Sequence, residues 1–252
     1  MTSVDTFPQA PTAILSALAE EQSGLIDLLE NARRVKHAGR EFWLGILHGH
    51  PVVLVLARIG KVAATTTAVA LIEHFKVGRI IFTGVAGGLG ESVNVGDVVV
   101  ADSFVQHDMD ASPLFPRYEV PLYGRTVFES NAALTALLHA AALAAGTVPA
   151  YPSARVHRGL MISGDRFVCG AQEAAGIRAG LMAAGHTPLA VEMEGAAVAQ
   201  VCHDYGVAFA SVRTISDRAD DTAHVDFPAF VAEVASVYAR AIVEKLLPEI
   251  SA

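Results

Sequence analysis

The strongest constraint on the fold is a succession of short apolar runs, separated by longer segments with helical periodicity. Runs that consist almost wholly of apolar residues predict strands buried on both faces, as in sheets that helices cover from two sides. Strands that alternate with helices in this way predict a three-layer αβα sandwich around a central mixed β-sheet.

The chain begins with a lead-in that has no periodicity, so residues 1–12 are expected to be disordered and structure to begin near Ala13. Apolar residues at helical spacing predict an amphipathic helix over Glu20–Arg33. Two apolar runs joined by His48-Gly49-His50-Pro51 predict a β-hairpin. Asp108–Glu129 contains three prolines and no stable period, and is expected to be a long functional or interfacial loop.

The remaining elements are predicted from the same periodicities. The expected strands are Ala13–Ala17, the hairpin pair Phe42–Leu47 and Val52–Ala57, Arg79–Thr83, Asp97–Val105, Gly159–Ser163, Leu189–Glu192 and Phe209–Ile215. The expected helices are Lys61–Phe75, an alanine-rich helix to Ala145 capped by Asn131, Ala171–Ala183, Gly195–Tyr205 and Phe227–Leu247.

Length and composition limit the class of protein. A chain of 252 residues, of which 52% are hydrophobic, can bury one large core. No internal repeat or linker divides it, so residues 13–252 are expected to form a single domain. The net charge of -8, with only 18 Lys and Arg residues spread thinly, provides no basic surface for a phosphate backbone, which argues against a nucleic-acid partner.

The sequence also predicts where the protein works. No basic residue precedes the apolar segment Ala13–Ala19, which argues against a signal peptide, and the apolar stretch Ala132–Gly146 is too short to span a bilayer. Cys169 and Cys202 lack the spacing of a disulfide framework or a zinc site. We therefore expect a soluble cytoplasmic protein that does not bind membranes.

Two segments place carboxylates in apolar surroundings. Val191–Ala197 contains Glu192 and Glu194, and Arg213–Asp217 ends in a third carboxylate. Buried charges are costly unless they meet a ligand or one another, so these segments predict a functional site.

Ligands of such a sheet bind beyond the carboxyl ends of its strands. Four predicted strand ends carry polar or glycine-rich segments, and one pocket could collect all four. These ends are Ala17–Glu21, Thr83–Gly90, Ser163–Phe167, and Glu192–Glu194 together with Ser216–Asp217.

The glycine-rich segment Gly84–Gly90 does not fit the known phosphate-binding templates. Val93 stands where a dinucleotide fingerprint needs glycine or alanine, and Gly60-Lys61 lacks the flanking residues of a Walker loop. Two interpretations stay open: tight turns with positive φ, or close approach of the backbone to an uncharged ring.

A metal site is not expected. If His107-Asp108-Met109-Asp110 is extended, its alternate side chains point in opposite directions, and no further ligand cluster is present in the sequence. We likewise expect no cofactor.

Six short motifs, in this order, resemble those of the nucleoside phosphorylase/nucleosidase superfamily, and most closely those of its 5′-methylthioadenosine/S-adenosylhomocysteine nucleosidases. The resemblance extends from about Ile14 to Leu247 and implies a nucleoside phosphorylase-like fold. The motifs are Ala17-Leu18-Ala19-Glu20-Glu21, Ile59-Gly60-Lys61-Val62-Ala63-Ala64, Thr83-Gly84-Val85-Ala86-Gly87-Gly88, Ser163-Gly164-Asp165-Arg166-Phe167, Val191-Glu192-Met193-Glu194 and Ser216-Asp217.

The resemblance implies hydrolysis of an adenosine N-glycosidic bond without metal or cofactor, as in methionine salvage. Asp217 matches the acid that protonates adenine N7, held by Ser216, and this role requires a raised pKa. Glu194 matches the carboxylate that binds the ribose hydroxyls and stabilises the cation-like sugar. Glu21 matches the base that activates water, and Arg213 is expected to neutralise or orient the buried carboxylates.

The resemblance also implies a set of substrate-binding residues. Phe167 matches the aromatic residue that stacks on adenine, Val168 reads the base edge, and Met193 lies beneath the ribose. The apolar wall for the 5′-alkylthio group matches Leu18, Ile59 and Phe227. The other implied contacts are Val85, Ala86, Gly87 and Glu192.

Each residue by itself has a simpler explanation. Glu194 could be a carboxylate favoured by a helix N-terminus, Asp217 a turn or cap residue, and Glu21 a solvated residue. Phe167 and Phe227 could pack in the core. Their joint occurrence in order favours the catalytic interpretation.

The sequence departs from the nucleosidase pattern at three places. Leu18 and Val85 replace the usual Met and Ser, and the loop over residues 108–129, which in family dimers reaches the neighbouring pocket, differs in length and composition. S-adenosylhomocysteine, 5′-deoxyadenosine and an aminodeoxyfutalosine-type nucleoside therefore all stay open as substrates. The resemblance also implies a homodimer, which the expected apolar face of Lys61–Phe75 would suit.

Two other functions compete with hydrolysis. A purine nucleoside phosphorylase needs a cationic cradle for phosphate, yet Leu18–Gln22 and Thr83–Gly88 contain no Arg, and Arg58 is the nearest cation. A non-enzymatic nucleoside-binding protein would tolerate loss of the acid or the base, whereas all three carboxylates are present here.

Overall fold

The computed structural model describes residues 9–22, 24–220, 223, 227 and 230–250. Residues 1–8 of the expected lead-in lie outside the described residues, and Thr12 already belongs to the first strand. No helix in the described part of the chain has the length and apolar character needed to cross a membrane.

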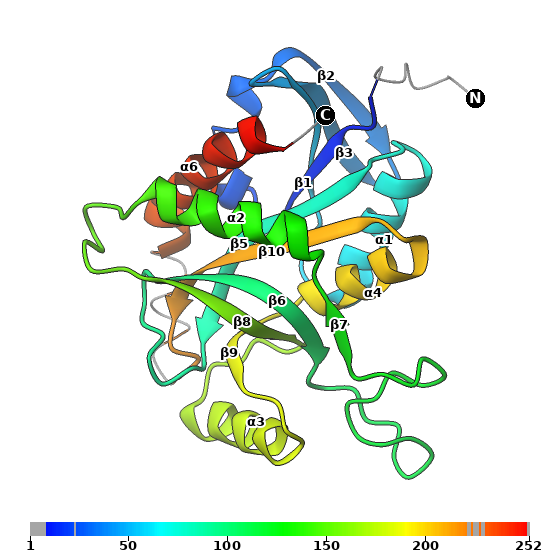
Figure 1. Ribbon diagram of the computed structural model, residues 1–252, viewed down its shortest axis with the longest axis vertical. Helices are drawn as coiled ribbons and strands as arrows, with labels where there is room; N and C mark the ends of the chain where they lie inside the picture. Colours follow the sequence, from blue (N-terminus) through cyan, green and yellow to red (C-terminus); the bar gives the residue numbers. More distant parts are fainter. Residues whose placement is uncertain (1–8, 23, 221–222, 224–226, 228–229, 251–252) are drawn as a thin grey trace.

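One mixed ten-stranded sheet forms the centre of the molecule, as predicted (Figure 1). The strand order is β10-β6-β8-β9-β5-β1-β4-β3-β2, β7 pairs with β6, and β10 also pairs with β5, so that half of the sheet closes on itself. The strands are β1 (Thr12–Ser16), β2 (Glu30–His37), β3 (Arg40–Leu47), β4 (His50–Leu56), β5 (Arg79–Gly88), β6 (Val98–Gln106), β7 (Val127–Glu129), β8 (Val156–Ser163), β9 (Pro188–Glu192) and β10 (Ala208–Asp217).

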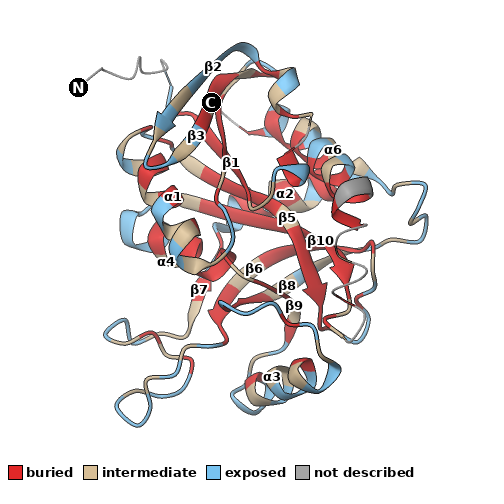
Figure 2. Ribbon diagram, turned by 180° about the vertical axis from the view of Figure 1, so that it is seen from behind, coloured by how far each residue is buried: buried red, intermediate tan, exposed pale blue. Residues whose placement is uncertain are grey.

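Helices cover both faces of the sheet. On one face α1 (Lys61–Glu73) packs beside α4 (Gly195–Tyr205), and on the other α2 (Ala132–Ala145) packs beside α6 (Ser236–Leu246) (Figures 1 and 2). The buried apolar side chains accordingly form one large cluster under each helix pair, and α3 (Ala171–Ala183) covers a third. The predicted three-layer architecture is confirmed.

The predicted helix over Glu20–Arg33 is wrong. Only short 3₁₀ turns form, at Glu20–Gln22 and Ile26–Leu28, and β2 starts at Glu30 and pairs antiparallel with β3. The apolar residues that suggested a helical face still contribute to the core, since Leu25 and Leu29 are buried. The backbone hydrogen bonds of antiparallel pairing with β3 outweigh local helix propensity, which is a weak determinant that tertiary contacts override.

Two strands run further than expected, and this affects the site. The strand predicted over Arg79–Thr83 continues through the glycines to Gly88, and β10 continues past Ile215 to Asp217. The two strands are parallel neighbours, and Asp217 lies opposite Gly87 in the register. The closing helix predicted over Phe227–Leu247 lies partly outside the described residues; it is π-helical over Val231–Ala235 before α6 begins.

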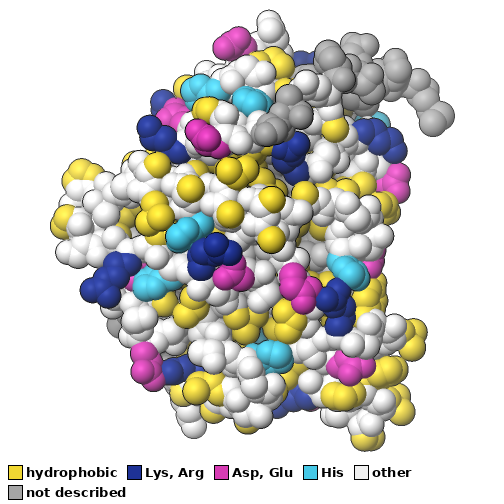
Figure 3. All heavy atoms as spheres, viewed as in Figure 1, with side chains coloured by type: hydrophobic (Ala, Val, Ile, Leu, Met, Phe, Trp, Pro, Cys, Tyr) yellow, Lys and Arg dark blue, Asp and Glu magenta, His cyan; other side chains and the backbone are white. Residues whose placement is uncertain are grey.

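Charged residues of both signs are interspersed on the face that Figure 3 shows. Arg158 on β8 pairs with Asp102 on β6, with 2.5 Å between Nη2 and Oδ1. Such an arrangement lacks the single-sign field that concentrates a polyelectrolyte partner.

The N-terminus of α2 supports a stability prediction. Asn131 caps this helix as expected, because its side chain accepts a hydrogen bond from Leu134 N. Asn131→Ala should lower the free energy of unfolding by about 1 kcal/mol. Asn131→Ser, which keeps an acceptor oxygen, is the control. Urea unfolding checks both, and an alanine variant as stable as the serine variant would contradict the capping role.

Candidate active site

A cavity of about 290 Å³ lies where β1, β5, β9 and β10 end. It collects every residue that the sequence suggested for the site except Arg213. The residues that line it are Ala17, Leu18, Glu21, Ile59, Val85, Ala86, Gly87, Arg166, Phe167, Val168, Val191, Glu192, Met193, Glu194, Ser216, Asp217 and Phe227.

Glu21 lies in the 3₁₀ turn after β1 and is buried. Its Oε2 accepts hydrogen bonds from Ala17 N at 2.7 Å and Leu18 N at 2.9 Å, and Oε1 accepts one from Val85 N at 3.1 Å. Burial raises the pKa of Glu21, and these backbone donors together with the positive charge of Arg213 partly oppose the rise. The carboxylate is therefore held in one orientation and is more basic than a solvated one.

Glu194 lies immediately before α4, at the other side of the cavity. Its Oε1 accepts a hydrogen bond from Gly60 N at 2.9 Å, and its side chain is buried. Burial, followed by the negative charge of Glu192, raises the pKa of Glu194 to about 8. Near neutral pH, and without a substrate, Glu194 is consequently mostly protonated.

Asp217 ends β10 and is almost wholly buried. Ser216 Oγ donates to its Oδ2 at 2.7 Å, and Ala219 N donates to its Oδ1 at 2.8 Å. Both carboxyl oxygens are thus held, and the predicted neighbour Ser216 does contact the group.

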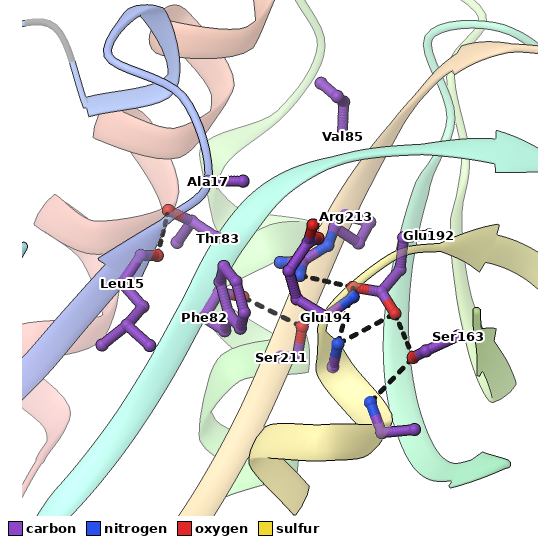
Figure 4. A network of polar contacts seen from close by, with 12 residues as sticks. Leu15, Ala17, Phe82, Thr83, Val85, Ser163, Glu192, Glu194, Ser211 and Arg213 are labelled. Carbon is purple, nitrogen blue, oxygen red and sulfur yellow. Dashed lines mark hydrogen bonds and ion pairs between the residues drawn. The ribbon is translucent and has the colours of Figure 1, made fainter. Parts of the chain in front are cut away.

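A buried ion pair joins Glu192, which lines the cavity, to Arg213, which does not (Figure 4). Arg213 Nη2 contacts Glu192 Oε2 at 2.8 Å, and the guanidinium lies 4.0 Å from the ring centre of Phe82. Glu192 also accepts from Ser163 Oγ and Gly195 N. Arg213 therefore does not line the cavity; it contacts Glu192 directly and acts on the other carboxylates through its charge.

The apolar part of the cavity is partly open to solvent. Phe167 and Phe227 meet edge to face with 5.5 Å between ring centres, and 39% of Phe167 is exposed. Ile59 is 56% exposed. Flat apolar surfaces of this kind suit an aromatic base and an aliphatic substituent.

The glycine segment makes room for carboxylates, which neither interpretation from the sequence foresaw. A Cβ at Gly84 would lie 2.9 Å from Glu21 Oε1, and a Cβ at Gly87 would lie 3.0 Å from Asp217 Oδ1. Both glycines belong to β5 and not to a turn. Side chains here would displace the two carboxylates.

The sequence analysis gave no individual role to four residues that belong to the site. Ala17, Val191 and Arg166 line the cavity, and Ser163 supports Glu192 from behind. All four lie inside or next to the quoted motifs, so adjacency to a motif was the available signal.

The basic side chains near the cavity have partners. Arg166, which lines the cavity, pairs with Glu173 at 3.0 Å between Nε and Oε1. Arg58 lines a different cavity and donates to Gly39 O. Among the described residues, no group of three or more His, Cys, Asp or Glu side chains is placed to hold a metal.

The chain is similar to a known protein family and to solved structures over nearly its whole length. A family model described as the phosphorylase superfamily matches residues 11–248. The 5′-methylthioadenosine/S-adenosylhomocysteine nucleosidase of Neisseria meningitidis, solved with methylthio-immucillin-A, is 32% identical, with a TM-score of 0.86 over 96% of this chain and 100% of that one.

Two further solved structures are similar. The S-adenosylhomocysteine nucleosidase of Streptococcus pyogenes, in complex with 5-methylthiotubericidin, is 31% identical with a TM-score of 0.86, covering 98% of this chain and 99% of that one. The futalosine hydrolase of Helicobacter pylori is 30% identical with a TM-score of 0.85, covering 96% of this chain and 98% of that one.

The raised pKa of Glu194 predicts a pH-dependent stability. Between its ordinary value of 4.5 and about 8, the folded protein keeps a proton that the unfolded chain has released. The resulting stabilisation is complete below pH 4.5 and is lost as the pH rises to about 8.

Glu194→Gln cannot lose this proton. The stability of the Gln variant relative to the unsubstituted protein should therefore rise with pH, by up to about 1.4 kcal/mol per pH unit, and level off above pH 8. Urea unfolding of both proteins from pH 5 to 9 measures this difference. A difference that does not vary with pH would show that Glu194 has an ordinary pKa.

Proposed function

Because this chain belongs to the phosphorylase superfamily and is an N-glycosyl hydrolase of the nucleosidase type, we propose that it releases adenine from 5′-methylthioadenosine and related 5′-substituted adenosines. The observation that carries this proposal is the convergence of three buried carboxylates, Glu21, Glu194 and Asp217, on one largely apolar cavity. Cleavage of an N-glycosidic bond needs an acid for the base, a stabiliser for the sugar and an activator for water.

Asp217 is proposed to act on the leaving group. Adenine is a poor leaving group as an anion, so protonation at N7 lets the electron pair of the C1′–N9 bond move into the ring. Ser216 and Ala219 hold the two carboxyl oxygens and so limit rotation of the acid. Phe167, which lines the same cavity, offers a face on which the base can stack.

Glu194 is proposed to bind the ribose hydroxyls. As the C1′–N9 bond breaks, positive charge develops on the sugar, and the ionised form of the neighbouring Glu194 carboxyl stabilises that charge. The positive charge of Arg213 opposes the rise in the pKa of Glu194 and so favours this ionised form. An interaction that is stronger in the transition state than in the bound substrate accelerates the chemical step.

Glu21 is proposed to activate the attacking water. Burial makes this carboxylate a stronger base, while three backbone N–H groups hold its two oxygens in place. Water that attacks C1′ transfers a proton to Glu21, and adenine takes a proton from Asp217, so the net reaction consumes one water.

The positions of the cations favour water over phosphate as the nucleophile. A phosphorylase has to bind phosphate beside C1′, which takes unpaired cationic donors. Here Arg213 is paired with Glu192 behind the cavity, and Arg166 is paired with Glu173. Glu21 occupies the wall next to Val85, where its negative charge would repel phosphate.

The 5′ substituent is the part of the substrate that the cavity constrains least. Ile59 and Phe167 are both partly exposed, so a thioether or a longer tail can extend outward. S-adenosylhomocysteine, 5′-deoxyadenosine and an aminodeoxyfutalosine-type nucleoside therefore belong to the proposed substrate class. A homodimer is part of the same proposal, because a second copy would cover the exposed Ile59 and Val62.

Product analysis tests the reaction type. With 5′-methylthioadenosine, the protein should release adenine and free 5-methylthioribose at a rate that phosphate does not change. Chromatography or mass spectrometry of the sugar, with and without phosphate, identifies the product. A sugar 1-phosphate that forms only when phosphate is present would overturn hydrolysis in favour of phosphorolysis.

Replacement of the proposed acid tests the mechanism. Asp217→Asn keeps the size of the side chain and one acceptor oxygen but cannot supply a proton to N7, so kcat should fall by a factor of at least about 100. Binding of a non-hydrolysable adenosine analogue, measured by calorimetry, should persist and serves as the folding control. A variant that keeps its turnover would remove Asp217 from the acid role.

A further inference from the structure

Helix α1 begins in an electrostatically unfavourable way. Its first residue is Lys61, the first turn contains no acidic residue, and Gly60 at the N-cap provides no side-chain cap. A positive charge at a helix N-terminus opposes the helix dipole, and this one is mostly buried, with 15% of the Lys61 side chain exposed. The unfavourable energy of this buried positive charge has to be offset by groups from elsewhere in the fold.

Carboxylates from distant segments provide that compensation. Lys61 N donates to Asp165 Oδ1 at 2.8 Å, so Asp165 caps α1 from the loop that follows β8. Lys61 Nζ contacts Asp108 Oδ1 at 2.6 Å and Gln106 Oε1 at 3.1 Å. The start of the helix is therefore held by residues more than 40 positions away in sequence.

The two aspartates are also connected to each other. Asp165 N donates to Asp108 Oδ2 at 2.9 Å, which closes a ring of three residues. We name Lys61, Asp108 and Asp165 the Lys61 clamp. Burial pushes the pKa of Asp108 upward, but the hydrogen bonds from Lys61 and Asp165 N and the charge of Lys61 outweigh this effect, so its pKa lies below the ordinary value. Asp108 is thus ionised at neutral pH, where it can pair with Lys61.

Lys61 and Asp165 lie close in sequence to residues of the site. Gly60, next to Lys61, donates its N–H to Glu194. Phe167 follows Asp165 by two residues and lines the cavity. Asp108 lies near the start of the long loop between β6 and β7; the sequence predicted this loop over residues 108–129, but its last three residues, Val127–Glu129, form β7.

We propose that the Lys61 clamp positions two sides of the cavity relative to each other, and that Asp165 and Lys61 are positioning residues for the ribose carboxylate and the base-stacking segment. By capping α1, Asp165 fixes the backbone of Gly60 and so directs its N–H at Glu194. This inference rests on the roles proposed above for Glu194 and Phe167.

The conformation of Gly60 supports the proposal. Its φ of +96° turns two successive N–H groups toward two different carboxylates, those of Glu194 and Asp165. A Cβ at this position would lie 3.2 Å from Asp165 Oδ1. A left-handed conformation at this tight contact favours glycine.

The proposal is testable because the two possible roles of Asp165 predict opposite changes in the pKa of Glu194. If Asp165 acted only through its charge, its removal would take a negative charge away from Glu194 and lower the pKa of that group. If Asp165 holds Gly60 in place, its removal weakens the N–H bond that lowers this pKa, and the pKa rises above 8.

The experiment compares Asp165→Ala with Asp165→Asn, because Asn keeps the acceptor oxygen and caps α2 in this same chain. The Ala variant should raise the pKa of Glu194, measured without substrate. This pKa is the pH at which the stability difference between a protein and its Glu194→Gln derivative levels off. The Ala variant should also lower kcat/KM for 5′-methylthioadenosine by about 10- to 100-fold. The Asn variant should stay within about threefold of the unsubstituted protein.

Asp102→Ala is the matched control. Asp102 is a comparably exposed, ion-paired aspartate, with 42% of its side chain exposed against 51% for Asp165, and it lies outside the cavity. Its loss should change neither readout. Asp108→Ala removes a second member of the clamp and is measured by the same two readouts, so the proposal can still be tested if an Asp165 variant fails to fold.

The proposed role of the clamp would be overturned if the pKa of Glu194 fell in the alanine variants. It would also be overturned if Asp165→Ala and Asp165→Asn changed this pKa and kcat/KM equally. The stability measurement does not depend on turnover, so the clamp can fail while hydrolysis of 5′-methylthioadenosine stands. Hydrolysis can equally fail, through a phosphorylated product, while the shift in the pKa of Glu194 still appears.

Discussion

The buried ion pair between Arg213 and Glu192 is the interaction on which the site depends. Both side chains are nearly inaccessible, so the desolvation of two charges has to be offset by close geometry and further hydrogen bonds. Ser163, Gly195 and the ring of Phe82 provide these contacts. The positive charge of Arg213 also opposes the rise in the pKa values of Glu21 and Glu194.

The carboxylates of the cavity differ in the number and kind of their hydrogen-bond partners. Glu21 accepts from three backbone N–H groups, whereas Glu194, within the described part of the chain, accepts from the N–H of Gly60. A carboxylate held by several donors is fixed in place, and one with fewer donors keeps oxygens available for substrate hydroxyls. This difference supports the proposed division between the base for water and the ligand of the ribose.

Strand pairing brings these groups together. In the parallel pair β5 and β10, Asp217 lies opposite Gly87, and the absence of a side chain at Gly87 leaves room for the Asp217 carboxylate. Gly84 does the same for Glu21, three residues earlier on the same strand. The glycines of β5 thus allow two acidic groups, far apart in sequence, to line one small cavity.

The sequence by itself determined the alternation of strands and helices and the capping of α2 by Asn131, because periodicity and local hydrogen bonding are short-range properties. The residues that gather in the cavity followed from the resemblance of six short motifs to a known superfamily. Only the tertiary structure decided the rest. It replaced the helix expected at Glu20–Arg33 with 3₁₀ turns and an edge strand, and placed Arg213 behind the cavity. It also joined Lys61 to Asp108 and Asp165. These outcomes depend on partners that lie far along the chain, and local sequence patterns contain no information about such contacts.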